Sequence, residues 1–223
     1  MRSASYTDIR SRTFALLRQP GGTDVDTQDD TDFRNAFARN FRRAWQAYEW
    51  PFSIGTERAN VSTVDGAVAL NVRGEVMAVY ADDPRTTGNA RALPYTIGDT
   101  HFYILGRRPA SVYVRYKLWE PEFDWEAYSE DATYEDWECA WKDGELMQFS
   151  AQTNAWTPLA IPYEFKEFLA LSCAGDLARG PGDQRSGEFY ALGERALDDE
   201  IYNSVRTLNR VQSLNVGTYK HGL

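Results

Sequence analysis

Residues 32–54 read DFRNAFARNFRRAWQAYEWPFSI, and this stretch decides the fold. Aromatic residues recur in it every three or four positions, a spacing that stacks their rings along one stripe of an α-helix. The stripe consists of Phe33, Phe37, Phe41, Trp45 and Tyr48. Asp30 or Thr31 can cap the start of the helix, and Trp50-Pro51 ends it because proline disfavours α geometry in the residue before it. Such a stripe must be buried against another apolar helix face, and the next comparable face lies more than a hundred residues later.

Length and composition predict a folded protein with a substantial core. The 223 residues, of which 43% are apolar, are enough for one large domain or two small ones. Cys139 and Cys173 lie too far apart in sequence for a disulfide framework, so we expect buried free thiols. The N-terminus has no apolar signal core, and no run reaches the roughly 18 apolar residues of a membrane span. We therefore expect a soluble, unsecreted protein with no membrane partner.

The negative charge is concentrated in one segment of the chain. Residues 119–145 contain 11 acidic residues against Lys142 alone, so they carry −10 of a net charge of −9 and leave +1 for the remainder. Nucleic-acid binding needs clustered Lys and Arg to neutralise phosphates, so this segment is not expected to bind nucleic acid. Its first acids are candidates for a functional acidic surface: Glu120, Glu122, Asp124, Glu126, Glu130 and Asp131.

The period of the apolar residues divides the chain into helical ends and a β-rich middle. Helical spacing predicts further helices over residues 6–17, 163–177 and 186–208, the last with a buried stripe that includes Gly193, Leu197 and Val205. Alternation between turn signals predicts strands within residues 60–70, 75–80, 100–105 and 111–118, followed by a hairpin within 134–156. The sequence loses its period after the last helix, so we expect an extended C-terminal tail there.

The fold class follows from burial, because amphipathic helices at both ends of the chain each need a partner. The sequence predicts an α+β fold in which the terminal helices pack as a helical bundle. This helical domain is discontinuous and covers residues 1–52 and 157–223. An antiparallel β domain over residues 53–156, which includes the acidic hairpin region, is inserted into it. The aromatic stripe then belongs to the core, which leaves the outward arginines as candidates for contact with neighbouring subunits: Arg34, Arg39, Arg42 and Arg43.

Three motifs in the helical part of the chain carry a family resemblance. Residues 50–54 read WPFSI, residues 155–184 read AWTPLAIPYEFKEFLALSCAGDLARGPGDQ, and residues 190–210 read YALGERALDDEIYNSVRTLNR. In this order they resemble the head-to-tail connector proteins of tailed bacteriophages, also called adaptor or tail-tubular proteins. The first is similar to the W-x-F that ends the N-terminal helix of that family. The second is similar to its pattern of W, then I-P-x-x-F, then a helix, then a small residue followed by G-D. The third resembles its long C-terminal helix.

The resemblance implies a structural role in a virion assembled in the host cytoplasm. A connector of this family forms a ring of about a dozen copies beneath the portal protein. A downstream tail or nozzle protein closes the ring from below, and double-stranded DNA passes through it without specific binding. In such rings the C-terminal helix and tail reach the portal, which makes these residues the portal-contact candidates: Val211, Leu214, Val216, Tyr219, Lys220 and His221. An acidic lumen would help DNA to slide, because negative charge repels its backbone.

Enzymatic chemistry has few candidate residues in this sequence. The two histidines, His101 and His221, form no HExxH pair, and no CxxC, nucleophile-elbow or phosphate-loop pattern occurs. Asp24, Asp26 and Asp29 or Asp30 miss the EF-hand spacing, so a solvated loop is favoured over a Ca²⁺ site. The sequence predicts a protein that is not an enzyme, with no catalytic residue, cofactor or metal.

The acidic and aromatic segment leaves an alternative open. Carboxylates among aromatic rings could bind a sugar or form a glycosidase acid and base pair, which needs two carboxylates facing a stacked ring. The rings concerned are Trp119, Trp125, Tyr128, Trp137 and Trp141. The alternative function is therefore a non-enzymatic binding module that recognises glycan or protein through Trp-rich acidic β loops.

Overall fold

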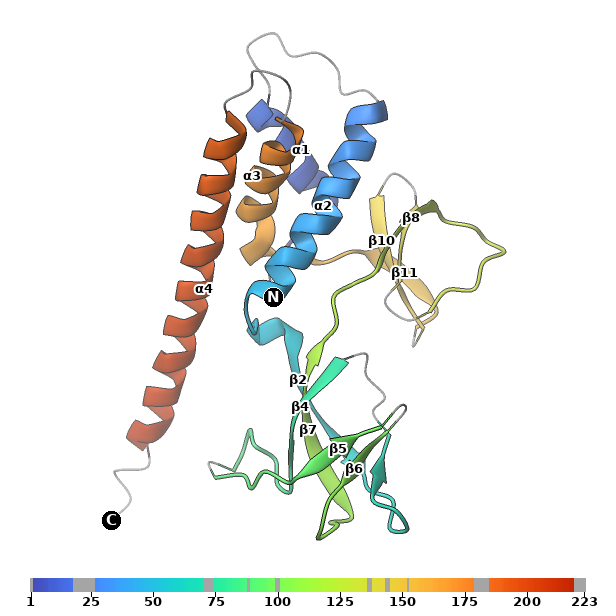
Figure 1. Cartoon of the computed structure of the whole chain (residues 1–223), viewed down its shortest axis with the longest axis vertical. Helices are drawn as coiled ribbons and strands as arrows, with labels where there is room; N and C mark the ends of the chain where they lie inside the picture. The colour runs from blue at the N-terminus through green and yellow to red at the C-terminus, as the bar shows by residue number, and fades with distance from the viewer. Residues whose placement is uncertain are drawn as a thin grey trace. The chain divides into compact units, whose positions relative to one another are not determined.

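The structure is a computed structural model with an α+β fold, which confirms the predicted class (Figure 1). It describes residues 2–17, 27–69, 74–87, 89–98, 101–135, 138–142, 145–151, 153–178 and 185–218, without the side chains of 27–29, 124–127 and 208–218. The chain forms two compact units. The first unit contains Met1–Tyr48 and Pro121–Leu223, and the second contains Glu49–Glu120.

Helix α3 is the centre of the first unit. The helices of this unit are α1 (Tyr6–Leu17), α2 (Thr27–Ala47), α3 (Lys166–Leu177) and α4 (Arg185–Thr218), and a 3-10 turn (Tyr163–Phe165) precedes α3. α3 packs against each of the other three helices. Every residue from Phe168 to Gly175 is buried, as expected for a helix that is apolar on all faces.

Four rings of the predicted aromatic stripe lie on α2 and are part of the core, whereas Tyr48 follows the end of this helix and is half-buried. Phe33, Phe37 and Phe41 are fully buried, and Phe41 stacks on Trp45 with ring centroids 5.8 Å apart. α2 begins at Thr27, several residues before the predicted cap, and ends at Ala47. The chain then turns through a short 3-10 helix, Pro51–Ser53, so the predicted proline stop is confirmed.

A four-stranded sheet belongs to the same unit as the helices. Its strands are β8 (Phe123–Ala127), β9 (Cys139–Lys142), β10 (Glu145–Ser150) and β11 (Ala155–Pro158), in the order β11-β10-β9-β8 with β8 parallel to β9. The antiparallel strands β9 to β11 confirm the hairpin predicted for residues 134–156.

The sheet packs on the aromatic stripe, and this contact moves the domain boundary. Phe123 meets Phe37 and Phe41 edge-on at 5.7 and 5.2 Å, and Trp141 meets Tyr6 at 5.4 Å. A separate two-stranded sheet, in which β1 (Ser3–Ala4) pairs with β12 (Ile161–Pro162), ties the N-terminus to the segment between β11 and α3. Residues 121–156 therefore group with the helices, whereas the sequence had assigned them to the inserted β domain.

The second unit contains two small antiparallel sheets. The first has the order β2-β7-β4 and the second β3-β6-β5. The strands are β2 (Ile54–Asn60), β3 (Ala67–Val68), β4 (Gly74–Tyr80), β5 (Tyr95–Ile97), β6 (Phe102–Ile104) and β7 (Ser111–Leu118). Val112 and Val114 of β7 are buried in the core of this unit, as the alternation predicted. The run predicted for residues 60–70 is not a single strand: among its described residues, Asn60 ends β2, a turn follows, and β3 begins after Gly66, whose φ is +78°.

Helix α4 corrects the prediction for the C-terminus. Its backbone is helical through Thr218, so residues 211–218 are not the extended tail that the sequence predicted. Near its start it approaches α3 closely at Gly193, where a Cβ atom would lie 2.8 Å from Ser172 Oγ. Gly187, two turns earlier on the same helix, has no such neighbour within 4 Å.

Replacing Gly193 by valine should therefore disturb the packing of α4 on α3, whereas the same change at Gly187 should not. We expect Gly193→Val to lower the free energy of unfolding by about 2 kcal/mol, because its side chain must push α4 away from α3. The matched change Gly187→Val should stay within about 0.5 kcal/mol of the wild type. Thermal or urea denaturation followed by circular dichroism measures both. Equal midpoints for the two variants would contradict the close approach.

Candidate interaction surface

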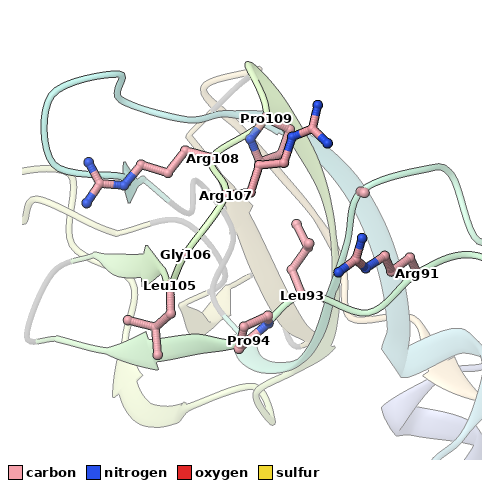
Figure 2. Close-up of a pocket in the computed structure, with 9 residues that line it drawn as sticks. Arg91, Leu93, Pro94, Leu105, Gly106, Arg107, Arg108 and Pro109 are labelled. Atoms are coloured by element: carbon pink, nitrogen blue, oxygen red, sulfur yellow. The ribbon is translucent and has the colours of Figure 1, made fainter.

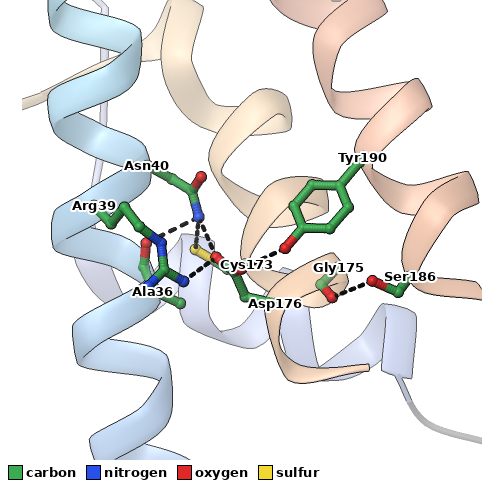
Figure 3. A network of polar contacts seen from close by, with 8 residues as sticks. All are labelled: Ala36, Arg39, Asn40, Cys173, Gly175, Asp176, Ser186 and Tyr190. Atoms are coloured by element: carbon green, nitrogen blue, oxygen red, sulfur yellow. Dashed lines mark hydrogen bonds and ion pairs between the residues drawn. The ribbon is translucent and has the colours of Figure 1, made fainter. Parts of the chain in front are cut away.

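A buried carboxylate joins three helices of the first unit (Figure 3). Asp176, near the end of α3, is only 5% exposed and accepts hydrogen bonds from two residues of α2. Asn40 Nδ2 donates to Asp176 Oδ2 at 2.8 Å, and Arg39 Nη2 lies 2.6 Å from the same oxygen. From α4, the Tyr190 hydroxyl donates to Asp176 Oδ1. One carboxylate thus fixes the positions of α2, α3 and α4.

The electrostatics of this cluster identify it as structural. Burial raises the pKa of the Asp176 carboxyl, but the hydrogen bonds from Tyr190, Arg39 and Asn40 outweigh it, so the pKa lies below its usual range. Asp176 is therefore ionised at neutral pH, and its oxygens are occupied by donors. Burial also raises the pKa of the adjacent Cys173 thiol, which keeps it neutral and unreactive. Both cysteines are buried free thiols, as predicted.

The predicted outward arginines of α2 make contacts within the chain. Arg34 is half-buried, pairs with Asp30 at 2.9 Å and lies over the Trp141 ring at 4.4 Å. Arg39 reaches Asp176 but keeps 59% of its side chain exposed. Arg43 is exposed and pairs with Glu194 of α4 at 2.9 Å, and Arg42 is also exposed. Arg39, Arg42 and Arg43 remain accessible to a neighbouring subunit, whereas Arg34 is largely committed to the sheet.

The acidic candidates differ in the exposure of their side chains and in the unit to which they belong. Glu122, Glu130 and Asp131 are exposed, and Glu120 is half-buried. Asp124 and Glu126 lie within strand β8, and their side chains are outside the description. The division into units places Glu120 in the second unit and the other five acids in the first.

The rings of the acidic segment are largely used in packing. Trp141 packs between Tyr6 and Arg34, and Tyr128 stacks on Tyr134 with centroids 5.8 Å apart. Trp119 is exposed, whereas the side chains of Trp125 and Trp137 are not described. Two of the rings considered for sugar stacking are thus occupied by other parts of the protein.

Other candidate groups have simple placements. His101 is exposed beside β6, and His221 lies outside the described residues. Asp30 bridges Arg10 and Arg34, whereas Asp24 and Asp26 are outside the description and the side chain of Asp29 is not described. Across the described residues, no group of three or more His, Cys, Asp and Glu side chains is placed to hold a metal ion. Within the same residues, no helix combines the length and the apolar character needed to span a bilayer.

Exposed apolar side chains that the sequence pattern did not predict lie on α4. Tyr202 is 66% exposed, Leu192 52% and Val205 38%, although Val205 had been assigned to the buried stripe. Gly193 and Leu197 of that stripe are buried as predicted. The portal-contact candidates Val211, Leu214 and Val216 lie on the same helix, without described side chains, and Tyr219, Lys220 and His221 lie outside the description.

Comparison with known proteins adds no relative to this description. Neither a scan against models of protein families nor a search of curated proteins finds a match to the chain. The interaction surface is therefore characterised by its own geometry: the exposed arginines of α2, the exposed acids of residues 122–131, and the open side chains of α4.

The Asp176 cluster gives a stability prediction with a definite pH dependence. A carboxyl whose folded pKa lies below its unfolded value stabilises the protein fully above about pH 5 and loses that contribution as the pH falls through the folded pKa. We expect Asp176→Asn to lower the free energy of unfolding by about 2 kcal/mol at pH 7, because three donors lose a charged acceptor. The difference from wild type should shrink below about pH 4.

Urea unfolding at several pH values measures this difference. The exposed Asp199 of α4 provides the matched control, and Asp199→Asn should change the stability by less than about 0.5 kcal/mol. A loss of stability in Asp176→Asn that stayed constant from pH 7 to about pH 3 would contradict the assigned role.

Proposed function

We infer that this protein is a structural protein of a tailed-phage virion. In this proposal it is a head-to-tail adaptor that forms a ring beneath the portal, joins the capsid to the tail and lets DNA pass. It acts without catalysis or cofactor, and its place is the virion, after assembly in the host cytoplasm. The helical bundle built from both chain ends, with its β insertion and C-terminal helix, would supply the portal and subunit contacts.

The observation that carries the proposal is the unequal length of two packed helices. α4 has 34 residues and α3 has 12, which correspond to about 51 Å and 18 Å at 1.5 Å per residue. α4 therefore extends well past the end of α3 (Figure 1). The part of α4 that extends beyond α3 leaves the side chains of Tyr202 and Val205 open to solvent. Such an exposed apolar segment is suited to burial against another protein.

The distribution of charge is compatible with DNA passage. The second unit has equal numbers of acidic and basic residues, so the net charge of −9 belongs to the first unit. Exposed carboxylates such as Glu122, Glu130 and Asp131 would repel a DNA backbone that passes them. Repulsion avoids the counterion release that makes basic surfaces bind DNA tightly. The proposal thus assigns to the acids a sliding surface.

The test is co-purification of this protein with the portal protein encoded in the same genome, followed by negative-stain imaging. We expect a ring in complex with the portal. Tyr202→Asp combined with Val205→Asp should reduce recovery at least tenfold, because two charges would have to be buried in the contact. Asn203→Asp combined with Thr207→Asp adds the same charge at exposed positions on another side of α4, and should have little effect. A wild-type protein that does not bind the portal would overturn the proposal.

A further inference from the structure

The second unit contains a pocket that the proposed function does not use (Figure 2). Its volume is about 470 Å³. Leu93, Pro94 and Leu105 give it apolar walls, and three arginines line it as well: Arg91, Arg107 and Arg108. Arg108 is held away from Arg91, because its Nη1 donates to the Val64 carbonyl at 2.9 Å.

Among the residues that the structure describes, the charges of the other two arginines are not matched by a partner. The guanidinium groups of Arg91 and Arg107 make no hydrogen bond or ion pair with any residue that the structure describes. Asp83, an acid close to Arg91 in sequence, forms its ion pair with Arg85 at 2.7 Å. Two guanidinium forks above apolar walls suit a ligand that carries carboxylates, because each fork can bind one carboxylate with two parallel hydrogen bonds.

A loop of the first unit presents carboxylates in a fixed arrangement. The Tyr134 hydroxyl closes this loop, accepting from Ser129 N at 2.8 Å and donating to the Ser129 carbonyl at 3.3 Å. The Tyr134 ring is itself held edge-on against Trp156 with centroids 4.7 Å apart. At the tip, Glu130 and Asp131 are exposed, and their carboxylates bond to none of the described residues. The tip therefore offers two adjacent carboxylates on a loop whose backbone is held in place, so binding has to order only their side chains.

We propose that the arginine pocket of one copy binds the acidic tip of a second copy, with Arg91 and Arg107 pairing with Glu130 and Asp131. Charge complementarity selects this occupant, since the chain carries both a pair of cations and a pair of anions that find no partner among the described residues. Pocket and tip are different patches, so the contact is heterologous and repeats from copy to copy into a ring or a filament. The inference rests on the proposed function in one respect, because a connector ring needs a contact of this kind.

A charge-swap experiment with the purified full-length protein tests the pairing. One variant carries Arg91→Glu and Arg107→Glu, and the other carries Glu130→Lys and Asp131→Lys. We expect the wild type to self-associate by sedimentation velocity at up to about 1 mM protein in about 0.1 M salt. Each variant alone should raise the dissociation constant at least tenfold, because like charges then face each other.

A 1:1 mixture of the two variants should regain the association of the wild type, since reversed pockets then meet reversed tips in alternation. The matched control carries Arg58→Glu and Arg85→Glu, two exposed arginines of the same unit outside the pocket, and should associate like the wild type. A monomeric wild type, a pocket variant that associates normally, or a mixture that stays apart would each overturn the proposal. A sedimentation behaviour of the mixture that did not depend on protein concentration would also overturn the proposal, since it would indicate a contact within one chain.

The two proposals fail in different ways. A wild type that binds the portal but remains monomeric alone up to about 1 mM would leave the adaptor role standing and overturn this contact. A charge-swapped mixture that associates, from a protein that never binds portal, would establish the contact and overturn the adaptor role. Loss of association in the pocket variant without rescue by the tip variant would assign the pocket to another anion, such as a phosphate.

Discussion

The aromatic stripe of α2 has to be shielded from water along its length, and the helix packed most closely against it is too short to shield it alone. α2 has 21 residues, whereas α3, its main helical neighbour, has 12. Tyr6 of α1, Phe123 of β8 and Phe165 beside α3 each cover a part of the stripe. These three residues come from the beginning, the middle and the later part of the chain. Burying one stripe therefore brings both chain ends and the sheet into one unit.

Elements with a strong apolar period could be predicted from sequence, whereas two edge strands without such a period could not. The stripe of α2, the apolar face of α3 and the alternation in β7 are local patterns that burial dictates. The edge strands β2 and β8 were missed because charged residues interrupt their apolar alternation: β2 reads IGTERAN and β8 reads FDWEA. Edge strands tolerate charge, which also protects them from pairing with other chains. Missing β8 is what displaced the domain boundary, since its Phe123 ties residues 121–156 to α2.

The candidate surface shows a second limit of pattern reading. A helical period identifies the outward face of α2, but the partners of that face come from distant parts of the chain. Arg39 meets Asp176 because α2 packs against α3, and Arg43 meets Glu194 because α4 lies close to α3, an approach that Gly193 permits. Likewise, Val205 continues the stripe of Gly193 and Leu197, but α3 is too short to cover it, whereas Tyr202 lies on the opposite side of α4 from Gly193. Burial depends on the length of the neighbour, which no local pattern encodes.

Acidity acts on this protein differently at long and at short range. Copies that each carry a net charge of −9 repel one another, and in about 0.1 M salt that repulsion is largely screened beyond about 10 Å. A carboxylate inside a walled pocket is screened much less, because protein replaces the surrounding water and ions. In the proposed contact, the acids of the Ser129 to Glu135 loop would therefore oppose association at a distance and favour it once they reach the pocket. Charge of this kind selects an oriented contact over random aggregation, which is what a structure built from identical copies requires.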